Sequence, residues 1–92
     1  MITRRYLVQG RVQGVGFRWF VEREARLIGM AGWVRNTDGG QVEVLAQGTG
    51  EQHGALRQKL EEGPRAARVE SVECSERPEA AKLEEFEIEG AW

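Results

Sequence analysis

Apolar and polar residues follow two different periods in the first third of the chain. Over residues 6–12 every second position is apolar or glycine, which is typical of a strand with one buried face. Over residues 17–28 the apolar positions recur at helical spacing, and they predict a stripe made of Phe17, Phe20, Val21, Ala25, Leu27 and Ile28. Trp19 falls on the opposite side of this helix, so we expect it to be partly exposed. Gly29 is expected to end the helix.

The middle of the chain predicts a hairpin followed by a second helix. Residues 32–35 and 41–47 have the character of strands, and the Asp38-Gly39 pair between them is typical of a hairpin turn. Thr49 and Gln52 have the spacing of a capping box, which favours a helix start. This second helix is expected to end at Gly63-Pro64, and its apolar residues are Ala55, Leu56 and Leu60.

The last third of the chain predicts two more strands joined by a loop. Residues 69–75 are expected to form one strand, and residues 77–82 the loop that follows. Over residues 83–90 Phe86 and Ile88 alternate with glutamates, which indicates a short final strand. We expect its acidic face to be a solvated edge that discourages pairing with other chains.

The order of these elements predicts a single domain, residues 1–92, in which two helices cover one face of a mostly antiparallel sheet. The order is β-α-β-β-α-β with one extra strand, and each β-α-β unit should cross over with a right hand. In a split β-α-β arrangement the first and second strands run parallel, with the third strand between them. Asn36, which closes the second strand, can therefore approach the loop that follows the first strand.

The composition is that of a small globular protein. The 92 residues are 40% hydrophobic and 30% charged, and no apolar run reaches the length of a membrane span. The N-terminus lacks the apolar core of a signal peptide, and Cys74 is the one cysteine, so we expect a cytoplasmic protein without an internal disulfide. We also expect a monomer.

Charge is unevenly distributed along the chain. Residues 1–35 hold seven arginines against two glutamates, whereas residues 36–92 hold six basic and thirteen acidic residues. The basic part contains a glycine-rich turn, which agrees with attraction of a small anionic ligand and argues against long nucleic acid. Chance scatter of charges over a polar surface is the alternative.

That glycine-rich turn lies between the first strand and the first helix. Gly14 and Gly16 can take positive φ, so that consecutive main-chain amides point toward one place, as in an anion-binding nest. No Ser, Thr, Asp or Asn precedes Phe17 as a cap, and the first charged residue of the helix is a cation, Arg18. The turn is therefore suited to an anion that the chain does not itself supply. An ordinary turn with a surface arginine remains the alternative.

Several kinds of catalytic site are disfavoured by the inventory of residues. His53 is the one histidine, and it belongs to the second helix, away from the glycine-rich turn, which argues against a hydrolytic triad. No spacing of His, Cys and acidic residues suggests a metal site, so we expect no bound metal. Arg18, Asn36 and the amides offer no general acid. They suit a leaving group that departs unprotonated, such as the carboxylate of a carboxylic–phosphoric anhydride, with a pKa of roughly 4 to 5.

Long motifs in the chain resemble acylphosphatase. The resemblance is carried by Gly10-x-Val12-Gln13-Gly14-Val15-Gly16-Phe17-Arg18, by Gly32-Trp33-Val34-x-Asn36, and by the later Asp38-Gly39, Val42-Glu43 and Gly63-Pro64. It spans nearly the whole chain, although the ending Gly90-Ala91-Trp92 departs from the one typical of the family. It implies a ferredoxin-like α/β sandwich that hydrolyses acyl phosphates to carboxylate and phosphate without metal or cofactor.

The resemblance also implies which residues act. The loop amides would bind the phosphoryl group of a small acyl phosphate, or phosphate and sulfate as ligands, through Gln13, Gly14, Val15, Gly16, Phe17 and Arg18. The guanidinium of Arg18 would join them, and Asn36 would orient the attacking water. Two alternatives are a non-catalytic phosphate-binding module on this fold and an RNA-binding module with the same order of elements. The second would need stacking aromatic residues on the central strands, and residues 42–45 offer none.

Overall fold

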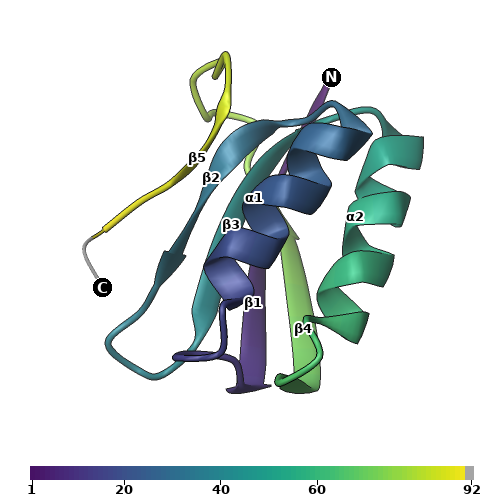
Figure 1. Ribbon diagram of the computed structural model, residues 1–92. Helices are drawn as coiled ribbons and strands as arrows, with labels where there is room; N and C mark the ends of the chain where they lie inside the picture. Colours follow the sequence, from purple (N-terminus) through teal and green to yellow (C-terminus); the bar gives the residue numbers. More distant parts are fainter. Residues whose placement is uncertain (91–92) are drawn as a thin grey trace.

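A sheet of five strands and two helices makes up the fold of the computed structural model, which describes residues 1–90 (Figure 1). Ala91 and Trp92, which belong to the atypical ending, lie outside the described residues. Along the chain the elements are β1 (Ile2–Arg11), α1 (Phe17–Ile28), β2 (Ala31–Asn36), β3 (Val42–Gly48), α2 (Gly50–Glu62), β4 (Arg68–Glu76) and β5 (Phe86–Ile88). This is the predicted order.

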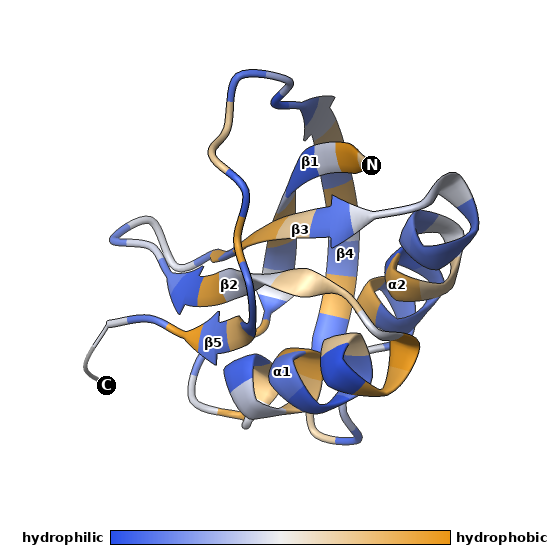
Figure 2. Ribbon diagram, turned by 90° about the horizontal axis from the view of Figure 1, so that it is seen from above, coloured by the Kyte–Doolittle hydropathy of each residue, from blue (hydrophilic) through white to orange (hydrophobic). Residues whose placement is uncertain are grey.

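The topology of the sheet is the predicted split β-α-β arrangement. The strands lie in the order β4-β1-β3-β2-β5, and only the β2–β5 pair is parallel within the described chain. Because β3 is antiparallel to both β1 and β2, those two strands run in the same direction on either side of it. Both helices cover the same face of the sheet, as Figures 1 and 2 show. The ferredoxin-like two-layer fold is thus confirmed.

The core lies between that face and the two helices. Tyr6, Val8 and Val12, which alternate along the first strand and its continuation, are all buried, as the sequence period predicts. They pack with buried residues of the helices, namely Phe17, Val21, Ala25, Leu56 and Leu60. Burial of an apolar side chain of this size contributes about 1.5–3 kcal/mol, so this cluster is the main source of stability.

The ends of both helices follow their local signals. Gly29 takes a left-handed conformation and ends α1, and its amide bonds back to the carbonyls of Ala25 and Arg26. Thr49 accepts from the amide of Gln52, whose side chain accepts from the amide of Thr49, so the predicted capping box is present. None of the described helices combines the length and the apolar character needed to span a membrane.

Two sequence expectations need correction. The helical period predicts Leu27 in the buried stripe of α1, but its side chain is 75% exposed. At 100° per residue it lies about 120° from the centre of the buried set, beyond the reach of the sheet. The final strand is also shorter than residues 83–90. The side chain of Gln47 accepts from the amide of Leu83 at 2.7 Å and donates to the carbonyl of Ala81 at 2.7 Å, so this part of the chain is held as a connection.

Candidate active site

The loop between β1 and α1 owes its path to two glycines. Gly14 has φ 75° and Gly16 has φ 77°, both in the left-handed region that side chains disfavour. A Cβ atom at either position would meet no other heavy atom within 4 Å. The requirement for glycine is therefore one of backbone conformation rather than of space.

The first turn of α1 lacks a capping side chain. Gly16 is the N-cap residue and offers no side chain for capping, and the first turn contains no acidic residue. The positive end of the helix dipole and the amides of this turn consequently face the loop without an anionic partner from the described chain. This arrangement is suited to binding an anion.

The end of β2 lies beside this loop because of the register of the sheet. Val42 of β3 pairs with Val8 of β1 on one side and with Asn36 of β2 on the other. The two parallel strands, β1 and β2, therefore end on the same side of the sheet, and β1 continues a few residues further into the loop. The predicted approach of Asn36 to the loop is confirmed.

Gln13 joins the loop to the turn that follows Asn36. Its side-chain amide donates to the carbonyl of Thr37 at 2.9 Å and to the carbonyl of Gln41 at 2.8 Å. The amide of Thr37 itself donates to the carbonyl of Gln41 at 2.9 Å, so one side chain spans both sides of the β2–β3 turn. The sequence predicts a role only for the main-chain amide of Gln13, because the partners of its side chain lie 24 and 28 residues away.

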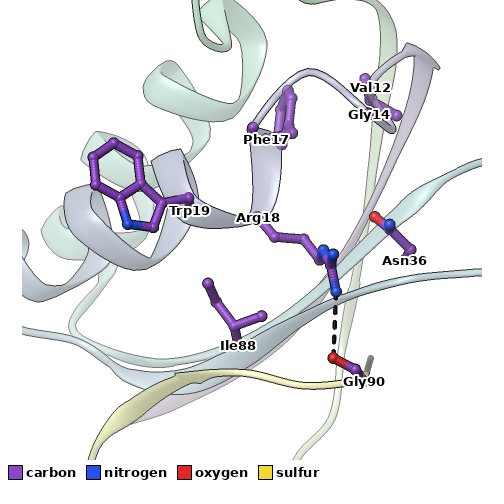
Figure 3. A pocket seen from close by; sticks show the side chains of 9 residues that line it. Val12, Gly14, Phe17, Arg18, Trp19, Asn36, Ile88 and Gly90 are labelled. Atoms are coloured by element: carbon purple, nitrogen blue, oxygen red, sulfur yellow. Dashed lines mark hydrogen bonds between the residues drawn. The ribbon is translucent and has the colours of Figure 1, made fainter. Parts of the chain in front are cut away.

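These elements surround a cavity of about 510 Å³ (Figure 3). Arg18 and Asn36 supply the polar side chains of its wall, and among residues 1–90 Arg18 is the one charged residue that lines it. The rest of the wall consists of glycine backbone and apolar side chains, from Val12, Gly14, Gly16, Phe17, Trp19, Ile88 and Gly90. The cavity thus combines one cation, one amide and loop amides in a largely apolar setting, where electrostatic interactions are strengthened.

The guanidinium group of Arg18 is oriented by the end of the last strand. Its Nη1 atom contacts the carbonyl oxygen of Glu89 at 3.4 Å. It also contacts the carbonyl oxygen of Gly90 at 3.5 Å (Figure 3). The amide of Glu89 bonds to the carbonyl of Val34 at 2.8 Å, which continues the parallel pairing of β5 with β2. The short final strand therefore brings two carbonyl groups to the edge of the sheet where Asn36 lies.

The structure gathers most of the predicted site residues, but not all, around this cavity. Gly14, Gly16, Phe17, Arg18 and Asn36 line it. Val15 faces a neighbouring pocket instead, and the side chain of Gln13 is directed to the β2–β3 turn. The sequence does not predict Ile88 and Gly90 as lining residues, because its pattern does not show which strand pairs with the last strand.

His53 belongs to the core rather than to this cavity. Its Nδ1 atom lies 2.7 Å from the hydroxyl of Tyr6, and its Nε2 atom lies 2.8 Å from the carbonyl oxygen of Ile2. Since that carbonyl can only accept, Nε2 carries the proton and Nδ1 accepts from the tyrosine. Burial lowers the pKa of His53 below its ordinary value, which favours this neutral form. Among residues 1–90 no three His, Cys, Asp or Glu side chains gather as metal ligands.

Comparisons with known proteins agree on one family. The model of the acylphosphatase family matches residues 4–88. An acylphosphatase of Koribacter versatilis is 56% identical over 98% of this chain and 82% of its own length. One from Thermococcus kodakarensis is 49% identical over 90% of each chain. The crystal structure of acylphosphatase from Bacillus subtilis superposes with a TM-score of 0.94 at 37% identity, over 98% of this chain and all of that one.

Proposed function

The chain belongs to the acylphosphatase family, and from that premise we propose how its residues divide the work of the reaction. The reaction is hydrolysis of the carboxyl–phosphate anhydride of an acyl phosphate to a carboxylate and inorganic phosphate. The matches to acylphosphatases argue against the two alternative functions, an RNA-binding module and a phosphate-binding module without turnover.

In this proposal the loop of residues 13–18 and the Arg18 side chain hold the phosphoryl group. The supporting observations are the uncapped start of α1, the left-handed glycines of the loop, and the position of Arg18 as the one charged residue in the described part of the cavity wall. A guanidinium can contact two phosphoryl oxygens at once, which fixes the orientation of the group as well as its charge. The carbonyls of Glu89 and Gly90 hold that guanidinium toward the cavity.

Asn36 orients the attacking water in the same proposal. The water oxygen forms a bond to phosphorus while the bond from phosphorus to the acyl oxygen breaks, and the carboxylate leaves with the electron pair. Both protons of the water finish on phosphate, so a dianionic acyl phosphate and water give a carboxylate and dihydrogen phosphate. No general acid is needed, because the leaving carboxylate is a weak base with a pKa of roughly 4 to 5. Positioning and charge stabilisation then supply the rate enhancement.

One observation carries this assignment: Arg18, Asn36 and the glycines of the loop line the same cavity. Arg18 comes from the first turn of α1 and Asn36 from the end of β2, so the sheet register and the Gln13 contacts are what bring them together.

Replacing each polar side chain by alanine tests the division of roles. Arg18→Ala should weaken both phosphate binding and turnover, because the same guanidinium acts in the ground state and in the transition state. Asn36→Ala should lower kcat by about 10²- to 10³-fold and leave the inhibition constant of phosphate nearly unchanged. Arg77→Ala, which removes a surface arginine far from the cavity, is the matched control. Equal effects of Arg18→Ala and Asn36→Ala on phosphate affinity would contradict the assignment.

The proposal also covers the domain organisation, location, oligomeric state and ligands of the protein. Residues 1–92 act as a single domain, as a cytoplasmic monomer, with a small-molecule acyl phosphate as substrate and phosphate or sulfate as further ligands. The proposed reaction uses no metal or organic cofactor, because the leaving carboxylate is a weak base that needs no Lewis acid. Neither nucleic acid nor membrane is a partner.

A further inference from the structure

A second cavity, of about 460 Å³, adjoins the first at the loop. Gly16 and Trp19 line both cavities, so the two meet at the start of α1. Val15, Phe20 and Pro64 give the second cavity an apolar wall, and Arg23 and Arg65 line it as well. No acidic residue lines it within the described chain. The catalytic roles proposed above leave this cavity without a function.

We propose that this second cavity receives the acyl group of the substrate, and that it favours acyl groups with a flat apolar body and a second negative charge at the far end. The inference rests on the proposed roles of Arg18 and Asn36, since it takes the position of the phosphoryl group from them.

The direction of the reaction supports this placement. Phosphoryl transfer requires the attacking and leaving oxygens to lie roughly in line, on opposite sides of phosphorus. Asn36, which orients the water, lines the first cavity only, whereas the second cavity begins beyond Gly16 and Trp19. In Figure 3 Asn36 and Trp19 lie on opposite sides of Arg18. A leaving group directed away from Asn36 therefore reaches the indole of Trp19 first.

Trp19 offers a flat apolar surface against which a flat acyl group can pack. It is 64% exposed, although it is one of the largest apolar side chains of the protein. The guanidinium carbon of Arg23 lies 5.9 Å from the ring centroid of Trp19 and 5.9 Å from that of Phe20, so it bridges the two rings. A ring or short apolar chain placed against the indole would gain contact area and offset-stacking or edge-to-face interactions.

The charges around the cavity favour an anion at its outer end. Arg65 is exposed, and Arg23 pairs with Glu24 at 3.0 Å. Glu24 is also approached by Lys59 at 3.9 Å, so this one carboxylate is shared between two cations. Among the described residues that line the cavity, Arg23 and Arg65 are the charged ones, and Glu24 pairs only with the first, so the local charge is positive and attracts a carboxylate or phosphate carried by the acyl group.

Ratios of kcat/KM between pairs of three substrates, compared between each variant and the unaltered protein, test the inference. The intrinsic reactivity of the substrates cancels in this comparison. Acetyl phosphate is the short reference, benzoyl phosphate adds the flat ring, and 4-carboxybenzoyl phosphate adds the charge. Trp19→Ala should lower the ratio of benzoyl to acetyl phosphate about three- to tenfold, whereas Trp19→Phe should keep most of it. Leu27→Ala removes another exposed apolar residue of the same helix and should leave the ratio unchanged.

The charged part of the inference has its own measurement. Arg65→Gln should lower the ratio of 4-carboxybenzoyl to benzoyl phosphate about two- to fivefold at low ionic strength, and added salt should reduce the same ratio in the unaltered protein. Arg77→Gln is the control. Unchanged ratios in the Trp19→Ala and Arg65→Gln variants, with normal hydrolysis of acetyl phosphate, would overturn the acyl-group site and leave the proposed function intact. Failure of the unaltered protein to hydrolyse any of the three substrates would overturn both.

Discussion

The side-chain amide of Gln13 donates a hydrogen bond of 2.9 Å to the carbonyl of Thr37, the residue directly after Asn36. A second bond of 2.8 Å reaches the carbonyl of Gln41 across the turn. The loop that is proposed to hold the phosphoryl group is therefore joined to the turn that carries the residue proposed to orient water. Gln13 acts in this account as a positioning residue, through its contacts with the β2–β3 turn.

Gln13→Ala removes both contacts without touching the guanidinium of Arg18 or the amide of Asn36. We expect kcat for acetyl phosphate to fall about 10- to 100-fold, because a misplacement on the order of 1 Å can cost about 10² in rate. The inhibition constant of phosphate should change much less. Gln9→Ala, which removes a half-buried glutamine bonded to Glu73 on the neighbouring strand, is the control for stability. A kcat at the level of the unaltered protein would show that the loop and the turn are held together by the sheet alone.

Arg18→Lys keeps the charge of the site but should lose most of the activity. A lysine ammonium is a point charge and cannot make the two parallel contacts with phosphoryl oxygens that a guanidinium makes. It also cannot retain the reach of Nη1 to the carbonyls of Glu89 and Gly90 while facing the phosphoryl group. Steady-state kinetics and phosphate inhibition of this variant are the measurement. Turnover and phosphate affinity near those of the unaltered protein would remove Arg18 from its role.

Inorganic phosphate should inhibit competitively and should stabilise the fold. A ligand that binds only the folded state adds about 2.7 kcal/mol at a concentration of a hundred times its Kd. Thermal unfolding with phosphate, sulfate or chloride at equal ionic strength measures the effect, and we expect shifts for the first two and much less for the third. Arg18→Ala should remove most of the phosphate shift. If phosphate raises the Tm no more than chloride does, the loop is not an anion site.

The buried pair of Tyr6 and His53 should make the stability depend on pH. Burial lowers the pKa of His53 in the folded state, so between the folded and unfolded pKa values the unfolded chain binds more protons. The contribution of His53 is therefore complete above about pH 6.5, the ordinary pKa of histidine, and is lost as the pH falls below it. Denaturant unfolding from pH 7.5 to 5.5 measures this slope.

The matched variant for that experiment is His53→Gln, which has no titratable group. We expect it to be less stable than the unaltered protein at pH 7.5 and to show a smaller slope down to pH 5.5. The carboxylate of Glu43 adds little in this range. Its burial alone would raise its pKa, but hydrogen bonds from Arg5 and Arg35 outweigh that and lower it, so it titrates at more acidic pH. Equal slopes for the two proteins would mean that His53 titrates normally in the fold.

Much of the fold could be predicted because its signals are local. The alternation of Tyr6, Val8 and Val12 follows from the pleat of one strand, and the capping box at Thr49 needs only the next three residues. The approach of Asn36 to the loop needed one more step, the topology of a split β-α-β unit, and the register with Val42 confirmed it. These features depend on short stretches of chain and on general rules of connection.

The remaining features depend on contacts between residues far apart in the sequence. The partners of Gln13 are set by the register of β1, β3 and β2 together, which no local pattern encodes. A histidine in a helix is ordinarily assigned to the polar side, and His53 is buried because Tyr6 and the carbonyl of Ile2 satisfy both ring nitrogens. The contacts of Arg18 with the end of β5 likewise required knowing that this strand pairs with β2.

The central claim is that the side chain of Asn36 orients the attacking water, and Asn36→Gly tests it most directly. Asparagine is also common in turns, where it serves only the backbone, and glycine preserves that backbone freedom while removing the amide. If Asn36 orients water, the glycine variant should fold normally, bind phosphate with unchanged affinity, and hydrolyse benzoyl phosphate with a kcat lower by about 10²- to 10³-fold. A folded Asn36→Gly variant with near-normal kcat would contradict the account.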